Sequence, residues 1–360
     1  MDSVRFLKIA ENFYYSNFID YEQILSSGTF VFSYYGSLVF QLFGISPVML
    51  GFLSVIYGTI TVYYIYKASL LLWENEKNAI RVAWFAALFP QLCLNSALFL
   101  REPIISMFTV ISAYHLIQFW KYQKTSGIII FVMLTLINTL LHTGSLFALV
   151  GLIAAIVLIP QQSRSKNKAF LSKLIALGLI GGSIMYVLTT GYGLEKVDQE
   201  TEDLFADVTA IQISGTRGGA MYPSWMQLQG GASDIVKLPF RFAAFLFAPL
   251  LPPMARSGGH ILGVFDGLLY LLLAIGIYKL RKQSIFSNKT AIVVLFVLIG
   301  LVFVYSMGVS NFGTGIRHRG KIAPLLLILY FHPKIYKELL RNQWANLNLR
   351  SKNQDIVKTP

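Results

Sequence analysis

The sequence predicts an all-α polytopic membrane protein, and two observations lead to this prediction. Of the 360 residues, 55% are hydrophobic and only 13% are charged, whereas a soluble domain carries about 25% charged residues. The mean hydropathy is +0.59, and apolar runs recur at lengths close to the roughly 20 residues that cross a hydrocarbon core as a helix. These runs are continuous rather than alternating with period two, which argues against a β-barrel.

We expect about nine spanning helices, each centred on one of these apolar runs. Two shorter or interrupted apolar pieces, 29–43 and 238–252, are not counted among them. Because prolines stand near both ends of 238–252, we expect that piece to be re-entrant or interfacial and to break at both ends. The predicted spans are 48–73, 79–99, 103–120, 127–141, 144–160, 170–189, 260–280, 290–308 and 321–333.

The distribution of positive charge predicts the topology. Eighteen of the 30 basic residues lie in five short stretches between or after apolar runs: 74–81, 121–124, 161–173, 279–289 and 334–358. Cytoplasmic segments carry such an excess, so the net charge of +13 reflects topology, and we expect no nucleic-acid partner. The chain is then a single transmembrane domain over 1–333, with a large extracytoplasmic loop over 190–259, and a basic cytoplasmic tail over 334–360. The region 1–47 also becomes external, which leaves open an upstream spanning helix.

The stretch from Asn311 to Lys321 contains the strongest functional signal. Arg317, His318, Arg319 and Lys321 stand between two apolar runs, on the side where the charge bias disfavours cations. Arginine offers a planar fork of donors that matches phosphate. A helix that begins near Thr314 would place Arg317 and Lys321 on one face. The pattern favours a site for an anionic, phosphorylated substrate, although a positively charged loop without a ligand is the alternative.

Five further residues are candidates for substrate binding. Arg101 and Glu102 precede Pro103 at a predicted helix start, where an ion pair or helix cap is an equally good interpretation. His142 stands at a predicted helix end, and a lone histidine is more often structural than catalytic. Arg217 lies among glycines that allow close backbone approach, although the Gly-Lys-Ser/Thr ending of a nucleotide loop is absent. Arg241 lies within an apolar run, where it needs a partner or a function.

The metal and cofactor requirements stay open. The chain has a single cysteine, Cys93, so a multi-cysteine metal site is excluded. We predict no dedicated metal site; whether the reaction uses a divalent cation is left open by the sequence. Four carboxylates near the start, those of Asp2, Glu11, Asp20 and Glu22, could supply a general base toward a sugar hydroxyl; each could equally be a solvated loop acid.

Four segments of the chain resemble GT-C-type membrane glycosyltransferases. Asp2–Asn12, Phe32–Gly36 and Leu42–Gly44 are similar to their first external loop, and Leu88–Pro103 is similar to the following helix pair. Arg317-His-Arg before a last helix resembles a feature of membrane proteins of capsule, O-antigen and exopolysaccharide pathways, including repeat-unit polymerases. The resemblance implies a polyprenyl-linked sugar substrate on the external face of a bacterial inner membrane. It also implies that Asp2 acts as the base.

The leading hypothesis is therefore transfer or polymerisation of glycans from a polyprenyl-phosphate or diphosphate donor. Its catalytic candidates are Asp2, Arg317 and Arg319; Arg101, Glu102, His142, Arg217, Arg241, His318 and Lys321 are the candidates for substrate binding. Partners would be the lipid-linked oligosaccharide, membrane lipid and other polysaccharide-assembly proteins. Two alternatives stay open. A flippase or transporter of the same lipid predicts charges spread through the spanning helices and internal symmetry, and a non-catalytic assembly partner needs no such site.

Overall fold

The structure is a computed structural model, and it describes residues 2–16, 18, 20–159, 177–178, 181, 221–228, 234–249, 258–281 and 285–333. Every regular element in these ranges is a helix, so the predicted all-α class is confirmed for them. An isolated antiparallel bridge joins Met221 to Asn311. The predicted tail 334–360 lies outside the described residues.

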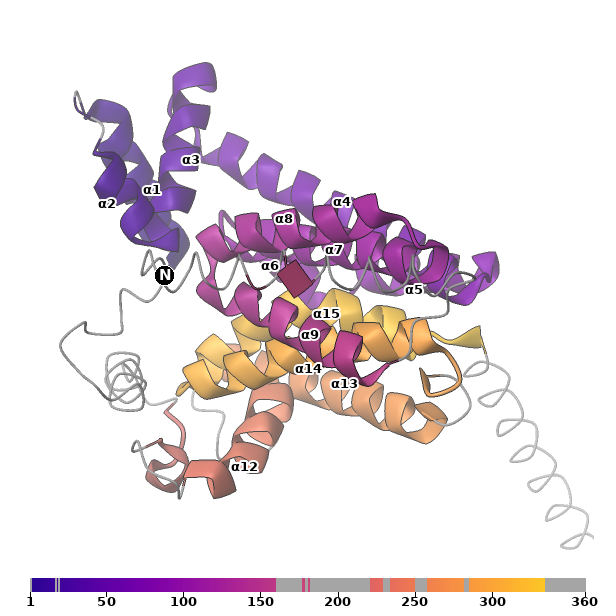
Figure 1. Cartoon of the computed structure of the whole chain (residues 1–360). Helices are drawn as coiled ribbons and strands as arrows, with labels where there is room; N and C mark the ends of the chain where they lie inside the picture. Colours follow the sequence, from indigo (N-terminus) through magenta and orange to yellow (C-terminus); the bar gives the residue numbers. More distant parts are fainter. Residues whose placement is uncertain are drawn as a thin grey trace, which may run out of the picture.

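The helices form one elongated bundle, with α1 to α3 set across one end of it (Figure 1). Turn residues and prolines set many of the boundaries: Ser27, Ser46, Asn75, Asn288 and Asn311 each cap a helix start through a side-chain oxygen. The helices are α1 Asp2–Tyr15, α2 Tyr21–Ser26, α3 Gly28–Phe43, α4 Pro47–Trp73, α5 Glu76–Ala87, α6 Pro90–Ser96, α7 Glu102–Tyr122, α8 Thr125–Leu141, η1 Thr143–Leu146, α9 Phe147–Leu158, η2 Ser224–Met226, α12 Asp234–Phe247, α13 Gly258–Leu280, α14 Lys289–Gly308 and α15 Phe312–Tyr330.

Three helices, α4, α7 and α14, are long and apolar enough to cross a membrane. Thr125–Leu141 and Thr143–Leu158 are shorter apolar helices. The predicted number of nine spans is not confirmed, and the predicted span 170–189 lies almost entirely outside the described residues. The membrane character is thus supported by three helices, and the finer topology stays a prediction.

The predicted single span 79–99 is wrong, because the chain forms two short helices there. Helix α5 ends at Ala87, and α6 begins at Pro90. The residue before a proline is disfavoured in the α region, and Phe89 accordingly has extended backbone angles. Pro90 then suits the first turn of α6, where its missing N–H would have no helical partner.

The predicted break at both ends of 238–252 is also wrong at its first end. Helix α12 runs without interruption through Pro239 and ends at Phe247, before Pro249. One interior proline removes one backbone hydrogen bond, and the buried side chains of Arg241 and Phe245 hold the rest of the helix in place. The predicted loop 190–259 therefore includes a packed helix.

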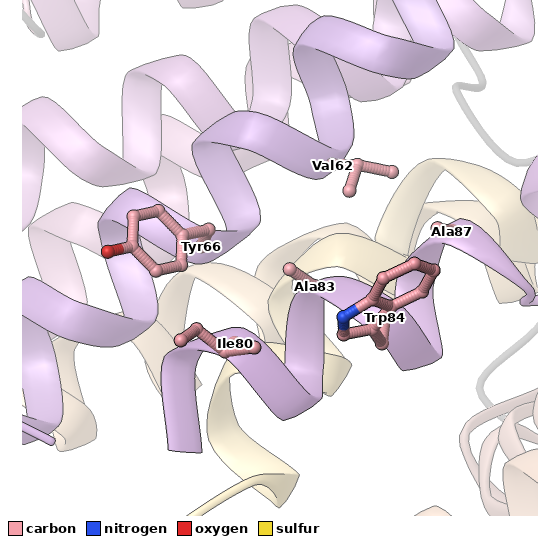
Figure 2. A pocket seen from close by; sticks show the side chains of 6 residues that line it. All are labelled: Val62, Tyr66, Ile80, Ala83, Trp84 and Ala87. Carbon is pink, nitrogen blue, oxygen red and sulfur yellow. The ribbon is translucent and has the colours of Figure 1, made fainter. Parts of the chain in front are cut away.

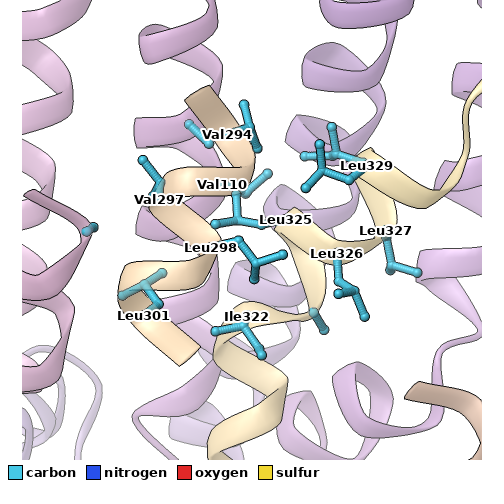
Figure 3. Close-up of a cluster of buried hydrophobic side chains, with 14 of the residues drawn as sticks. Val110, Val294, Val297, Leu298, Leu301, Ile322, Leu325, Leu326, Leu327 and Leu329 are labelled. Carbon is cyan, nitrogen blue, oxygen red and sulfur yellow. The ribbon is translucent and has the colours of Figure 1, made fainter. Parts of the chain in front are cut away.

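Helix α15 forms the centre of the bundle. Every residue from Arg319 to Leu329 is buried, and a helix that is buried on all sides belongs to a core rather than to a surface. Figure 3 shows how Ile322 and Leu325 meet Leu298 and Leu301 of α14, with Val110 of α7 close by. The apolar run that predicted a span at 321–333 thus marks the central helix of the bundle.

Pro324 lies within α15 without ending the helix. Its missing N–H leaves the carbonyl oxygen of Gly320 without a helical donor. The hydroxyl of Ser106 on α7 donates a hydrogen bond to that oxygen, at 3.1 Å. A neighbouring helix therefore supplies the lost bond, which is how prolines are tolerated in buried helices.

A second, smaller core joins α1 and α3 to the bundle. Phe32 of α3 stacks on Phe99 at 4.5 Å between ring centroids and meets Phe6 of α1 edge-on at 5.3 Å. Leu50 of α4 and Leu141 of α8 are buried in the same cluster. This core positions the start of α1, and therefore Asp2, against the bundle.

Candidate functional site

Most of the predicted site residues meet at one end of the bundle. Asp2 begins α1, and Glu102 begins α7 with Pro103 in its first turn. His142 follows the last residue of α8, while α15 starts after Asn311, whose side chain accepts a hydrogen bond from Gly313 N at 2.8 Å. Figure 1 shows the start of α1 at this end. Helix ends from four parts of the chain thus converge here.

Arg317 is held between two carboxylates. Its Nη1 pairs with Asp2 Oδ2, and its Nε lies 2.8 Å from Glu102 Oε1. Lys321 Nζ lies 3.8 Å from the same Glu102 oxygen, as expected for residues four apart on one helical face. Side-chain exposure falls from 47% at Asp2 and 25% at Arg317 to 1% at Glu102 and 0% at Lys321. The charges therefore form a chain from the surface into the bundle.

Three aromatic rings lie beside these charges. The ring of His318 is 4.8 Å from His142 and 5.5 Å from Tyr305, and His142 is 5.3 Å from Tyr305, measured between centroids. Lys321 Nζ is 5.5 Å from the centroid of Tyr305. His318 Nδ1 is buried and has no hydrogen-bond partner in the described part of the chain. Two imidazoles and a phenol thus line the inner side of the site, next to a buried cation.

Arg101 joins three helices at the same end. Its Nη1 donates to the carbonyl oxygen of Leu141 at 2.9 Å, and its guanidinium carbon lies 5.4 Å from the ring centroid of Phe6. Burial lowers the pKa of the Arg101 guanidinium; the Glu102 carboxylate acts in the opposite direction, and Arg5 lowers the pKa further. An arginine stays protonated in proteins. This is therefore a cation whose charge a nearby anion would stabilise.

Arg241 lies apart from these charges, and its side chain binds backbone carbonyl oxygens. Its fully buried guanidinium donates to the carbonyl oxygens of Ser306, Met307 and Val309 at 3.1, 2.8 and 2.6 Å, and to that of Met226 at 2.8 Å. Helix α14 ends at Gly308, and the last carbonyls of a helix have no helical donor. Arg241 thus caps the C-terminus of α14.

Arg319 has the same kind of role for α12. Its Nη1 donates to the carbonyl oxygen of Leu246 at 3.0 Å, its Nη2 donates to that of Ala248 at 2.7 Å, and Nη2 lies 3.4 Å from Asp266 Oδ2. Tyr270 donates to the carbonyl oxygen of Arg319 at 2.9 Å. The structure therefore places Arg319 with the end of α12 and with α13, apart from the contacts of Arg317.

The sequence interpretation missed two residues. Asp266, which pairs with Arg319, is a single carboxylate inside the apolar run 260–280; a charge at such depth is a signal for a buried partner. Tyr305, which lines the site, stands in a run of apolar residues and carries no comparable signal. The predicted site residue Arg217 lies outside the described residues.

The charge of the site is positive. Four cations at this end, those of Arg5, Arg101, Arg317 and Lys321, are accompanied by the carboxylates of Asp2 and Glu102. Within the described ranges, no group of three His, Cys, Asp or Glu residues could hold a metal ion. The arrangement is suited to an anion rather than to a cation.

An apolar pocket of 270 Å³ lies between α4 and α5 (Figure 2). None of the candidate site residues lines it. Trp84 on its rim is 67% exposed, as is common for side chains that face lipid or its interface. The lining residues are Val62, Tyr66, Ile80, Ala83, Trp84 and Ala87.

Comparisons of the chain with protein-family models, with curated proteins and with solved structures give no match.

Proposed function

We propose that this protein is a membrane-embedded glycosyltransferase that uses a polyprenyl-phosphate- or diphosphate-linked saccharide. One observation carries the proposal: Arg317 and Lys321 share the buried carboxylate of Glu102, while the outer side of Arg317 meets the exposed carboxylate of Asp2. The site thus places an arginine that can bind phosphate next to an exposed carboxylate that can act as a base. The likeness of the N-terminal segments and of Arg317-His-Arg to GT-C and polymerase sequences supports the same reaction.

The reaction breaks the bond between the anomeric carbon of the donor sugar and the phosphate oxygen, and it forms a bond from that carbon to an acceptor hydroxyl. Asp2 takes the hydroxyl proton. The leaving phosphate or diphosphate keeps the electron pair, and its developing charge is stabilised by the guanidinium of Arg317. Arginine has five N–H donors, and the two contacts described for Arg317 leave its Nη2 end for the substrate.

The other residues take supporting roles in this proposal. Lys321 adds positive charge behind Arg317, and His142, His318 and Arg101 surround the same space. Arg241 and Arg319 are not assigned to catalysis, because all three guanidinium nitrogens of Arg241 and both terminal nitrogens of Arg319 already donate to backbone carbonyls. Polymerisation of repeat units, a bacterial inner-membrane location and an extracytoplasmic site belong to the same proposal.

A test uses purified protein in liposomes with a polyprenyl-diphosphate-linked oligosaccharide and an acceptor. We expect Arg317→Ala to abolish most product, whereas Lys8→Ala, which removes an exposed charge from α1, leaves the yield unchanged. A ladder of product lengths identifies a polymerase, and a single added unit identifies a transferase. Full activity of Arg317→Ala would overturn the assignment.

A flippase of the same lipid is the second candidate. The buried pairs Lys321–Glu102 and Arg319–Asp266 favour it, because buried charges in helical bundles often mark transport pathways. The same liposomes distinguish the two: a flippase moves a fluorescent lipid-linked saccharide to the other leaflet with its phosphate–sugar bond intact.

A further inference from the structure

Helix α12 turns its charged side chains inward and its apolar side chains outward. Asp234 and Arg241, seven residues apart, lie on its buried side and are 4% and 0% exposed. Ile235, Val236 and Phe240 on the other side are 69%, 71% and 52% exposed. A helix at a water-facing surface does the reverse, with its apolar stripe toward the core and its charges outward. The polarity of α12 is therefore inverted.

The three charged side chains of α12 have partners inside the protein. Lys237 Nζ lies 2.7 Å from Asp234 Oδ1 and donates to the carbonyl oxygen of Gln227 at 2.7 Å. The guanidinium of Arg241 donates to four backbone carbonyl oxygens, three of them at the end of α14. Charged residues of lipid-embedded helices face the bundle interior and pair in this way, with each other or with backbone carbonyls. The charges of α12 are thus compatible with an apolar medium around it.

The outer side of α12 adjoins the exposed side of α14. Figure 1 shows α12 at an outer edge of the bundle, beside α14. Phe303 of α14 and Ile299, one turn before it, are both exposed, and the ring of Phe303 lies 5.9 Å from that of Phe242 on α12. Phe242 and Ile235 are seven residues apart and so lie on nearly the same side of α12. Because α14 is long and apolar enough to cross a membrane, the outer side of α12 continues a surface that meets lipid when α14 does so.

An exposed tryptophan stands beside this outer side. The ring of Trp225 lies 5.3 Å from that of Phe240, and both side chains are exposed. The next residue, Met226, is buried, and its carbonyl oxygen accepts a hydrogen bond from Arg241 Nη1 at 2.8 Å. The turn that carries Trp225 is therefore fixed to α12. Tryptophans are enriched where a membrane protein passes from lipid to water.

We propose that α12 lies in the bilayer, with Ile235, Val236 and Phe240 in contact with lipid and with Trp225 at the membrane surface. The partner is lipid, because the inverted polarity indicates an apolar medium and the adjoining face of α14 belongs to a helix able to span a membrane. This interaction surface goes beyond the proposed glycosyl transfer and does not depend on it. Arg319 binds the carbonyl oxygens at the end of α12, so α12 connects the lipid-facing surface to α15.

Spin labelling in liposomes tests the proposal. Cys93 is the single cysteine of the chain, so a Cys93→Ser background accepts one nitroxide at a time. Val236→Cys probes the outer side of α12, Ile299→Cys is the reference on the exposed face of α14, and Glu22→Cys, at an exposed position of α2, is the aqueous reference. Relaxation by oxygen reports lipid exposure, and relaxation by a water-soluble nickel chelate reports exposure to water. Size-exclusion chromatography checks that each labelled protein is folded.

We expect the label at Val236 to match the label at Ile299, with strong relaxation by oxygen and weak relaxation by nickel, and the label at Glu22 to show the reverse. Strong nickel relaxation at Val236 would place the outer side of α12 in water and overturn the proposal. Weak relaxation at Val236 by both reagents would show that protein, such as a second copy of the chain, covers α12, and it would overturn the proposal as well. The assay measures no transferase activity, so its failure is distinct from a failure of the proposed function.

Discussion

Arg317 and Arg319 stand two residues apart on α15 and have opposite environments. Arg317 is partly exposed and meets the side-chain carboxylates of Asp2 and Glu102. Arg319 is fully buried, and its Nη1 and Nη2 donate to the carbonyl oxygens of Leu246 and Ala248. Two residues correspond to about 200° around a helix, so the two side chains point to opposite sides of α15.

This difference separates two uses of a buried cation. At the end of α12, as at the end of α14, an arginine satisfies the carbonyls that the helix leaves without donors. At the other site, cations and carboxylates from α1, α7 and α15 meet each other, and the outermost pair is open to solvent. The first arrangement stabilises the fold, and the second leaves donors for a ligand.

The largest expected effect is a loss of folding stability when an arginine that caps a helix is removed. Arg319→Ala removes two hydrogen bonds to α12 and leaves Asp266 buried without its cation. Breaking a buried ion pair in this way costs about 3–5 kcal/mol of stability. We expect a large fall in the thermal midpoint of the purified protein, measured by tryptophan fluorescence.

The double variant Arg319→Met with Asp266→Asn is the control for that loss. Because it removes both charges, we expect it to be more stable than Arg319→Ala alone. A thermal midpoint for Arg319→Ala equal to that of the unaltered protein would contradict the assignment of a cap.

The next effect separates activity from stability. We expect Arg317→Ala to reduce glycan transfer by about 10²–10³-fold, the loss typical when one donor to a developing negative charge is removed. Its thermal midpoint should fall much less than that of Arg319→Ala, because the carboxylate of Asp2 stays in contact with water and the buried carboxylate of Glu102 keeps Lys321 as its cation. Parallel activity and melting measurements on both variants provide the check, and equal losses of stability would remove the distinction between the two arginines.

A smaller loss of stability is expected when the buried pair Glu102–Lys321 is altered. Glu102→Gln removes the negative charge beside the buried ammonium of Lys321 but keeps an amide oxygen that can accept its hydrogen bond, so we expect a smaller loss of stability, about 1–3 kcal/mol. Adding Lys321→Met should recover part of that stability. The coupling between the two substitutions can be measured as a double-mutant cycle, and strict additivity would show that the pair at 3.8 Å does not interact.

The smallest effect lies at the opposite end of α4 and α7. Lys121 Nζ is 2.5 Å from Glu74, which is 74% exposed, and its hydrogen bond and charge hold the pKa of the Glu74 carboxyl below its ordinary value. A folded-state pKa that is depressed contributes stability above the unfolded pKa and loses it as the pH falls through the folded pKa. Melting curves of Glu74→Gln should lose this part of the acid dependence. An exposed pair contributes about 0.5 kcal/mol or less, so a larger change would contradict this account.

Helical periodicity predicted some contacts of the site and missed others. The spacing of Arg317 and Lys321 predicted a shared face, and both residues do reach Glu102. The apolar run 79–99 predicted one helix, but Pro90 divides it, because hydropathy does not register a missing N–H. The break predicted at Pro239 is the opposite error: the proline suggested a helix end, whereas packing of Arg241 and Phe245 keeps α12 intact.

The sequence by itself determined the helical class, the apolar character that three helices share with membrane spans, and the concentration of cations next to the apolar run 321–333. These properties follow from composition and from local spacing along one helix. Only the tertiary structure decided which arginine faces carbonyls and which faces carboxylates. That choice depends on the helix ends and acidic side chains that α1, α7, α12 and α13 bring to α15 from distant parts of the chain.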